Sequence, residues 1–413
     1  MLHTNGDDIK CRNFLHCLHG GIMNRIGYIQ NKYPEQRCII NKTKNNYVNL
    51  SRLNFARYAY YLDKLRGADF SNFQFIFIGI VPSSIKLMHF FNFITPQKKN
   101  WVTTFETSLP RCRELISIHH NPDYVDGIKR CPAVEKKLKW IASEHCKAII
   151  ALSQSAKKIQ KNILNVYSEY KDTIENKIHV VAPPQKILIS NNSKKELNET
   201  DEIRVLFVGG DFYRKGGAET VIALNNIVRK TNIKLSLTVI GDLARKNNYV
   251  LKEWKDDEGF CKKVSEIIEQ EPWIVHHQSL SNYEVLNLMQ QSHVGLLPTW
   301  SDTYGYSVLE MQASGCPVIT TNVRALTEIN NEHCGWVIKL PLNKYSELAI
   351  DSQEKKDSFR NTIISGIENA ILELNSKRGL IQVKSTNSID RIIAQHDPED
   401  YKSQLEKIYD KCS

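Results

Sequence analysis

The sequence lacks any long apolar segment. Its longest strongly apolar run, residues 75–81, is far shorter than the roughly 20 residues that a helix needs to cross a bilayer. The start of the chain also lacks the basic and apolar regions of a secretory signal, because Asp7 and Asp8 stand there. These absences lead us to expect a cytoplasmic protein that spans no membrane.

Cysteine motifs are also missing. The ten cysteines are scattered along the chain, and none of them forms a C-x-x-C pair. A zinc site or a disulfide framework would show regular cysteine spacings, so neither is expected here. We interpret the cysteines as reduced and structural.

The composition is that of a soluble globular protein. Apolar residues make up 41% of the chain and charged residues 24%. Because a single core rarely grows beyond about 250 to 300 residues, a chain of 413 residues predicts two domains.

Positive charge is concentrated in the first half. Residues 1–186 hold 28 Lys and Arg against 14 Asp and Glu, a net charge of +14, whereas the remaining residues have a net charge of −4. Such a bias is typical of proteins that meet an anionic partner, either an acidic membrane surface or nucleic acid. Ordinary solubilising surface charge explains the bias equally well.

The first half alternates between strand and helix patterns, which favours parallel βαβ units. Residues 75–81 and 101–105 are short apolar strand candidates on either side of a predicted helix over 85–93. The further elements predicted here are strands over 148–152 and 178–181 and a helix over 154–166, which Ser153 caps.

A polar segment, residues 187–202, has the composition of a domain linker. We therefore predict an N-terminal domain over 1–186, a C-terminal domain over 203–394 and a final helix over 395–413. The C-terminal domain has the rhythm of a doubly wound open sheet, in which ligands bind beyond the carboxyl ends of the strands. Its predicted strands cover 203–208, 234–240, 273–276, 294–297 and 318–320, and its predicted helices include 218–228, 283–290 and 306–313.

A glycine-rich motif with two cations follows the first of these strands. Residues 209–217, GGDFYRKGG, contain Arg214 and Lys215 and lead into a helix. Glycines let the backbone approach a ligand and a helix N-terminus attracts anions, so the motif suits a diphosphate. A tight turn with exposed basic residues is the alternative. The motif is neither a Walker loop nor a dinucleotide fingerprint, because the G-K-[ST] and G-x-G-x-x-G patterns are absent.

A second motif, LLPTWSDTYGYSVLEMQASGCPVIT, spans residues 296–320. Asp302 lies in its predicted loop and Glu310 in its predicted helix, so the two carboxylates could bind different hydroxyls of one polar ligand. Loop amides around Tyr304 and Gly305 could face a phosphate or a sugar. A capping Asp and a solvated helix Glu are the structural alternative.

Taken in order, the two motifs resemble the donor domain of the family-four retaining glycosyltransferases of GT-B fold. That family shows G-[GR]-x-x-x-x-K-G after a strand and, further along, P-S-x-x-E-x-F-G-x-x-x-x-E-A-x-x-x-G-x-P-V-[IV]. The resemblance covers residues 146–340. It implies an α/β protein with two Rossmann-like doubly wound domains that face a cleft.

The resemblance also implies an activity. A glycosyl group would move from a nucleoside diphosphate sugar, expected to be UDP-linked, to a hydroxyl of a glycan or lipid-linked acceptor, with retention of the anomeric configuration. Assembly of a cell-surface polysaccharide or glycolipid is the expected setting. The positive N-terminal domain would then dock peripherally on the inner face of the cell membrane.

Site residues are implied position by position. Arg214 and Lys215 match the cations that hold the donor diphosphate, and Glu310 matches the acid that binds the ribose. Asp302 matches the acid near the sugar, where the family usually has Glu. Because Gly210 stands where many members have Arg, Arg214 is expected to supply the missing charge. The remaining donor-binding positions implied by the resemblance are Gly209, Gly210, Thr303, Tyr304, Gly305 and Tyr306.

The N-terminal half resembles the family more weakly. Residues 101–106 resemble the strand after which many members place a His or an acid facing the reacting sugar, so Glu106 is a catalytic candidate beside Arg214, Lys215 and Asp302. His119 and His120 are competing candidates for this catalytic group. The alternative interpretation is that the two histidines lie in a surface loop and have no role. The family's glycine-rich N-terminal loop is not clearly present, and residues 19–21, HGG, are a poor substitute.

The implied chemistry is a front-face attack in which a donor phosphate oxygen accepts the proton of the acceptor. The protein stabilises the charge that grows on the diphosphate and excludes water. We expect no metal and no cofactor, because the cations take this role and no D-x-D motif stands in a suitable place. The alternatives are a sugar-nucleotide epimerase or a phosphorylase on the same fold, or a basic nucleic-acid-binding protein, although no nucleic-acid module is recognisable.

Overall fold

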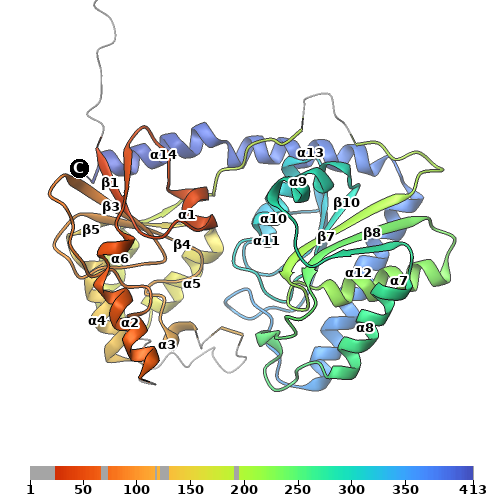
Figure 1. Cartoon of the computed structure of the whole chain (residues 1–413), viewed down its shortest axis with the longest axis horizontal. Helices are drawn as coiled ribbons and strands as arrows, with labels where there is room; N and C mark the ends of the chain where they lie inside the picture. Colours follow the sequence, from red (N-terminus) through yellow and green to blue (C-terminus); the bar gives the residue numbers. More distant parts are fainter. Residues whose placement is uncertain (1–23, 67–72, 117–118, 121–129, 190–194, 413) are drawn as a thin grey trace, which may run out of the picture.

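The computed structural model describes residues 24–66, 73–116, 119–120, 130–189 and 195–412. It contains two parallel six-stranded sheets flanked by helices, which form two lobes side by side (Figure 1). The predicted α/β architecture of two doubly wound domains is therefore confirmed. No helix among the described residues is long and apolar enough to cross a membrane.

The first sheet has the strand order β2-β1-β3-β4-β5-β6. Its neighbouring strands all pair in parallel, so their carboxyl ends share one edge. The strands are β1 (Arg25–Tyr28), β2 (Asn46–Asn49), β3 (Ile85–Phe91), β4 (Trp101–Phe105), β5 (Cys146–Ala151) and β6 (Ile178–Val180). The helices are α1 (Tyr33–Cys38), α2 (Phe55–Leu65), α3 (Arg113–Ile116), α4 (Pro132–Ala142), α5 (Gln154–Leu164) and α6 (Lys171–Glu175).

The structure corrects two predictions in this domain. Residues 75–81 form no regular strand, since they make only isolated bridges and Phe75 has a left-handed φ of 57°. Residues 85–93 are not a helix, because Ile85–Phe91 is the central strand β3, which is almost wholly buried. A parallel strand covered on both faces shows a continuous apolar run instead of alternation, which is why its pattern was ambiguous.

The second sheet has the order β12-β11-β10-β7-β8-β9. The predicted strand 294–297 and helix 306–313 coincide with β10 (Val294–Leu297) and α10 (Tyr306–Ala313). The other strands are β7 (Ile203–Asp211), β8 (Leu235–Asp242), β9 (Ile274–His277), β11 (Val318–Thr321) and β12 (Gly335–Ile338). The other helices are α7 (Gly217–Lys230), α8 (Glu258–Gln270), α9 (Asn282–Gln291), α11 (Leu326–Ile329), α12 (Gln353–Ser376), α13 (Leu380–His396) and α14 (Pro398–Asp410).

The last helix returns to the first domain. In Figure 1, α13 and α14 cross the molecule so that α14 lies along the lobe of β1–β6. The Tyr409 hydroxyl lies 2.6 Å from Nδ1 of His89 on β3, and the Tyr401 hydroxyl donates to the Cys38 carbonyl at 2.5 Å. Helix α14 therefore follows the second domain in the chain but packs on the first domain.

Candidate active site

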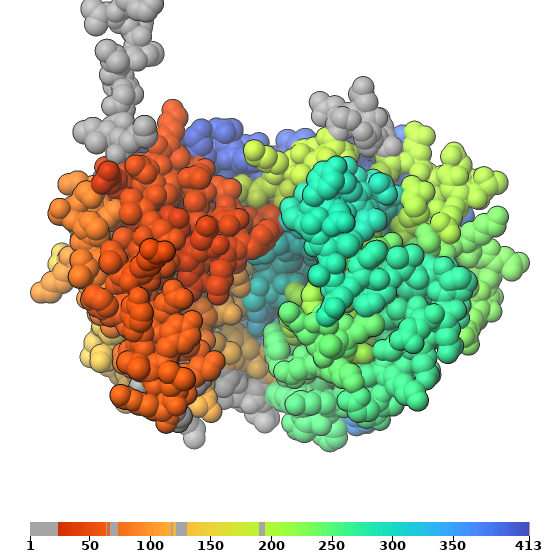
Figure 2. Space-filling view, in the orientation of Figure 1, coloured from red at the N-terminus to blue at the C-terminus, as the bar shows by residue number. Residues whose placement is uncertain are grey.

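A cleft opens between the domains at the carboxyl ends of their strands. It has a volume of about 690 Å³ and takes Glu106 and Arg111 from the first domain. Figure 2 shows the hollow between the two lobes. From the second domain the cleft is lined by Asp211, Arg214, Lys215, Ala244, Arg245, Lys246, Asn247, Tyr249, Asp302 and Thr303. Four predicted catalytic residues, from positions far apart in the sequence, are thus brought to one cavity.

The glycine-rich motif is folded against the second motif. Gly216 caps α7 with a φ of 84°, and a Cβ there would lie 2.2 Å from the carbonyl oxygen of Pro298. Only glycine fits this close approach without strain. The backbone N–H of Trp300 also donates to the carbonyl of Arg214 at 3.0 Å. This contact fixes the two cations beside the loop that carries Asp302.

Lys215 and Asp302 form an ion pair inside the cleft. Nζ of Lys215 lies 2.5 Å from Oδ2 of Asp302, and both side chains are largely buried. Burial raises the pKa of Asp302, but Lys215, Arg214 and the Tyr304 amide outweigh it and hold the pKa below its usual value. The aspartate is therefore charged at neutral pH and presents its second oxygen to the loop.

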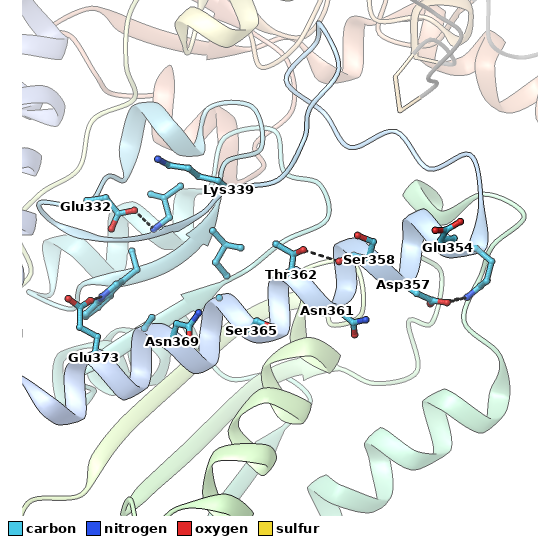
Figure 3. A pocket seen from close by; sticks show the side chains of 16 residues that line it. Glu332, Lys339, Glu354, Asp357, Ser358, Asn361, Thr362, Ser365, Asn369 and Glu373 are labelled. Atoms are coloured by element: carbon cyan, nitrogen blue, oxygen red, sulfur yellow. Dashed lines mark hydrogen bonds between the residues drawn. The ribbon is translucent and has the colours of Figure 1, made fainter.

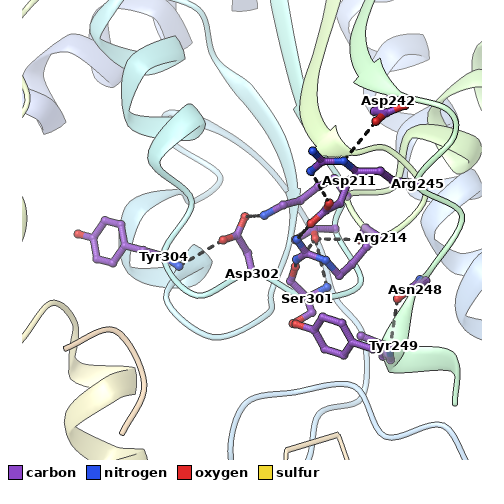
Figure 4. Close-up of polar contacts among 12 residues, drawn as sticks. Asp211, Arg214, Asp242, Arg245, Asn248, Tyr249, Ser301, Asp302 and Tyr304 are labelled. Carbon is purple, nitrogen blue, oxygen red and sulfur yellow. Dashed lines mark hydrogen bonds and ion pairs between the residues drawn. The ribbon is translucent and has the colours of Figure 1, made fainter. Parts of the chain in front are cut away.

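Arg214 is held by its neighbours. Its Nη1 donates to the Ser301 carbonyl at 2.8 Å, and its Nη2 pairs with Asp211. The guanidinium also lies 5.5 Å from the centre of the Tyr249 ring, whose hydroxyl is 3.1 Å from Oγ of Ser301 (Figure 4). These contacts hold the Arg214 side chain in the lining of the cleft.

The loop after Asp302 turns sharply into α10. Oδ1 of Asp302 accepts from the Tyr304 amide at 3.3 Å, and Gly305, with a φ of 95°, is the N-cap of α10. Tyr304 is buried and Tyr306 is half-buried, and their rings lie 5.4 Å apart. The loop that was expected beside the donor phosphate and sugar is therefore packed next to the cleft cations.

Glu310 is engaged by the first domain. Its Oε1 accepts from Nη1 of Arg37 at 3.1 Å and from the Tyr33 hydroxyl, and both partners lie on α1. The Arg37 guanidinium also lies 4.9 Å above the Tyr306 ring. Glu310 is not a solvated helix residue, and the structural alternative for it is wrong. The sequence YPEQRC of α1 carries no motif, so Tyr33 and Arg37 could not be found from it.

Glu106 directly follows β4 and faces the same cleft. Its Oε2 lies 3.7 Å from Nη1 of Arg111, and its backbone N–H donates to Oδ1 of Asn92 at 3.4 Å. The structure thus places this first-domain carboxylate opposite Lys215 and Asp302 of the second domain.

His119 and His120 contact residues of the second domain. Nδ1 of His119 lies 2.8 Å from Oε1 of Glu347, and the His120 amide donates to Oε2 at 2.9 Å. Nε2 of His120 lies 3.3 Å from Oγ of Ser301, next to Arg214. Burial lowers the pKa of His120 to about 4, so its ring is neutral. The interpretation as a surface loop pair is wrong, because both rings are buried in a domain contact.

A larger groove of about 1370 Å³ lies between β12 and α12 (Figure 3). Acidic side chains line it, among them Glu332, Asp357 and Glu373. It shares no lining residue with the cleft, and its charge would repel an anionic ligand. The cleft is therefore the better candidate for a phosphate-bearing substrate. The predicted substitute for an N-terminal glycine loop, residues 19–21, lies outside the described residues.

Residues 189–367 match a family described as "Glycosyl transferases group 1". This match covers both sequence motifs of the second domain. Among curated glycosyltransferases, an uncharacterized one from Methanocaldococcus jannaschii is 23% identical over 280 residues, 65% of this chain and 63% of that protein. The D-inositol 3-phosphate glycosyltransferase of Paenarthrobacter aurescens is 27% identical over 129 residues, 31% of this chain and 29% of that protein. The chain thus spans less than two thirds of these relatives.

The glycosyltransferase fold is shared over nearly the whole chain. Sucrose-phosphate synthase from Thermosynechococcus elongatus has a TM-score of 0.54 at 13% identity, covering 94% of this chain and 98% of that one. The pneumococcal O-GlcNAc transferase, solved in complex with UDP and GlcNAc, has a TM-score of 0.51 at 9% identity, covering 78% and 57%. This chain therefore has the GT-B fold.

Proposed function

We propose that the protein transfers a glycosyl group from a nucleoside diphosphate sugar to an acceptor hydroxyl, with retention of configuration. The observation that carries this proposal is the cleft itself, where Lys215 and Arg214 stand opposite Glu106 of the other domain. Cations fixed where negative charge develops are the principal means by which a protein lowers the barrier of such a transfer.

The donor diphosphate would bind beside Lys215 and Arg214. Lys215 is paired with Asp302 at 2.5 Å, so an arriving diphosphate would share or take over this cation. Asp302 would then turn its acceptor oxygens toward the hydroxyls of the transferred sugar. As the glycosidic bond breaks, the leaving diphosphate gains charge, which the two cations stabilise.

Glu310 would bind the ribose of the donor. Tyr33 and Arg37 both contact Oε1, and we assign Oε2 to the ribose hydroxyls. The same carboxylate would thereby join the nucleotide to α1 of the first domain. Donor binding would favour the closed arrangement of the two domains, since Glu310 would contact both the ribose and α1 of the first domain.

The acceptor would occupy a second pocket in the first domain, which we name the acceptor pocket. It has a volume of about 540 Å³ and lies where Gln30 and Asn31 follow β1. Its lining combines the rings of Tyr60, Tyr61 and Phe75 with polar groups. Such a surface suits a glycan, whose sugar faces pack on rings while its hydroxyls make hydrogen bonds. We propose a glycan or lipid-linked acceptor used in cell-surface polysaccharide or glycolipid assembly.

Helix α2 would dock this domain on a membrane. Its apolar side chains Phe55, Leu62 and Leu65 are 50%, 51% and 85% exposed. Basic residues Lys64 and Arg66 stand at its end. An exposed helix of this kind binds the surface of an acidic bilayer through both its apolar and its basic side chains. Tyr60 and Tyr61 of the same helix line the acceptor pocket, so docking would bring that pocket to the inner membrane face.

The first experiment is a thermal-shift panel of UDP, GDP and ADP and their sugars. A ligand at 100 times its dissociation constant adds roughly 2.7 kcal/mol of stability, which such a panel detects readily. UDP is the first choice, since the pneumococcal relative of this fold was solved with UDP and GlcNAc. Transfer from the stabilising donor, followed by NMR of the anomeric proton in the product, tests retention. No stabilisation by any nucleoside diphosphate would contradict the proposal.

The alternative activities have separate readouts. Isomerised sugar nucleotide without an added acceptor would indicate an epimerase, and incorporation of inorganic phosphate would indicate a phosphorylase. A salt-dependent shift of DNA without turnover would indicate nucleic-acid binding. We also propose that the reaction uses no metal, because the cleft cations supply the positive charge. EDTA should leave the transfer rate unchanged, and loss of transfer restored by a divalent cation would contradict this.

A further inference from the structure

The space beside Gly210 is bordered by a cation from another loop, Arg245. A Cβ placed on Gly210 would meet nothing closer than Nη1 of Arg245, at 4.0 Å. Gly210 is exposed at the end of β7, and its φ lies outside the left-handed region. A larger residue would therefore fit there, and the space that its side chain would take is the space that the Arg245 guanidinium approaches.

Arg245 is held in this position by two aspartates. Its Nη1 lies 3.2 Å from Oδ1 of Asp211, and its Nε lies 3.2 Å from Oδ2 of Asp242 at the end of β8 (Figure 4). Burial raises the pKa of Asp211, but Arg214 and Arg245 outweigh it and hold the pKa below its usual value. Asp211 thus lies between two guanidinium groups that both face the cleft.

The two arginines differ in freedom. The Arg214 side chain is 15% exposed and donates to the fixed Ser301 carbonyl, whereas the Arg245 side chain is 62% exposed. An incoming anion can therefore recruit Arg245 without breaking a contact to buried backbone. Lys215 approaches from the other side of Gly210, since a Cβ on the adjacent Gly209 would lie 2.7 Å from the Lys215 side chain.

We propose that Arg245 binds the donor diphosphate in the space that Gly210 leaves open. The positive charge beside Gly210 is then supplied by Arg245 of the loop after β8 and not by a residue of β7. Arg245 and Lys215 would contact the diphosphate from opposite sides of Gly209 and Gly210. Because a guanidinium forms two parallel hydrogen bonds to phosphate oxygens, it suits this position better than a lysine would. This inference rests on the proposed function and names a further group of the same site.

The test measures binding of UDP, GDP and ADP by calorimetry, and carries forward the one that the wild type binds most tightly. Arg245→Ala should weaken its binding about 10-fold or more, while Arg245→Lys should retain part of the affinity. The double variant Gly210→Arg with Arg245→Ala returns a guanidinium to the same space, so it should recover most of the loss. Arg229→Ala is the matched control, because Arg229 is 67% exposed and pairs with Glu271 at 3.2 Å away from the cleft.

Each outcome decides the matter. Wild-type affinity in Arg245→Ala would overturn the proposal while leaving nucleotide binding, and with it the proposed function, intact. A double variant that binds no better than Arg245→Ala would overturn the assignment of this space to the diphosphate. Equal loss in Arg245→Ala and Arg245→Lys, together with a lower Tm for both, would show a structural role instead. Absence of nucleotide binding in the wild type would overturn the proposed function itself.

Discussion

At the scale of single residues, the cleft depends on carboxylates and cations that hold one another in place. Asp302 and Asp211 pair with Lys215, Arg214 and Arg245. A buried cation without a carboxylate is costly, so Lys215 and Arg214 need these partners, which also hold the two cations in place for an anion. Substitutions here therefore need a stability measurement beside every activity measurement.

Replacement of Lys215 should separate catalysis from folding. Lys215→Ala is expected to lower turnover roughly 10²-fold or more, because a charge aimed at the leaving diphosphate is lost. It also leaves Asp302 buried without its partner, so the Tm should fall, and Lys215→Ala with Asp302→Asn should recover part of that fall. Steady-state kinetics and calorimetric scans measure both effects. Lys230→Ala, exposed at the end of α7, is the control, and a wild-type rate in Lys215→Ala would remove the donor-site assignment.

Replacement of Glu310 tests the ribose contact. Glu310→Gln should weaken nucleoside diphosphate binding by about 1 to 3 kcal/mol, since a charged acceptor becomes a neutral one. Arg37→Ala serves as the matched variant, because it removes the ion pair between Glu310 and the first domain but keeps the carboxylate. Calorimetry should show a larger loss for Glu310→Gln than for Arg37→Ala. Equal losses would mean that Glu310 acts only through the domain contact.

At the scale of elements, α2 and α14 have opposite surroundings. Helix α14 buries Tyr401, Leu405, Ile408 and Tyr409 against the first domain, as their helical spacing predicts. Helix α2 instead exposes much of its apolar surface. Exposed apolar side chains beside basic residues are typical of helices that lie on a membrane surface, and this is why we propose membrane docking for α2.

Vesicle flotation tests the role of α2. The wild type should float with vesicles rich in acidic lipid at low salt and less at high salt, because each basic residue near such a surface contributes about 1 kcal/mol that salt screens. Leu62→Ser with Leu65→Ser should reduce flotation at both salt concentrations. The control is Tyr283→Ser on α9, which removes an exposed apolar side chain outside α2, since Tyr283 is 74% exposed. Negligible binding of the wild type to acidic and neutral vesicles alike at low salt would remove the membrane proposal.

At the scale of the whole molecule, carboxylates of the second domain help to hold the two domains together. Three carboxylates of the second domain reach the first. Glu310 meets Arg37, Glu347 meets the two histidines, and Glu328 accepts from the amides of Gln154 and Ser155 at 2.8 and 2.7 Å. Of these three contacts, the pair of Arg37 with Glu310 joins opposite charges of the two domains.

Buried neutral histidines should make the stability depend on pH. Burial lowers the pKa of His89 to about 3 and that of His120, His293 and His396 to about 4. Between these values and about 6.5, the unfolded chain binds protons that the folded chain excludes, so the free energy of unfolding should fall as the pH drops below about 6.5. Each such histidine contributes roughly 1.6 kcal/mol of loss between pH 6.5 and pH 5.

Urea unfolding at pH 5, 6 and 7 measures this slope. His89→Gln should show a shallower slope than the wild type, since its ring bridges Tyr409 of α14 and Thr104 of β4 and its titration is removed. The exposed His333→Gln should keep the wild-type slope. Identical slopes for His89→Gln and the wild type would show that His89 does not contribute.

Local sequence patterns predicted the main elements around the two motifs of the second domain. β10, the loop with Asp302 and α10 were all predicted in place, because glycines, a proline and a continuous apolar strand mark them locally. The segment after β8 was marked as a ligand-binding edge by the sheet rule, which is the signal that leads to Arg245 and Tyr249. The first domain was predicted less well, since β1 and β2 have four residues each and carry too few apolar positions for a pattern.

The groups that face one another across the cleft could not be found from local sequence patterns. Nothing local links Arg37 to Glu310 or His120 to Ser301, because these contacts join residues 273 and 181 positions apart. The place of Arg245 beside Gly210 likewise follows from the parallel register of β7 and β8, which brings two loops to one edge of the sheet. Sequence patterns report what each segment buries, whereas a binding site depends on where separate segments meet.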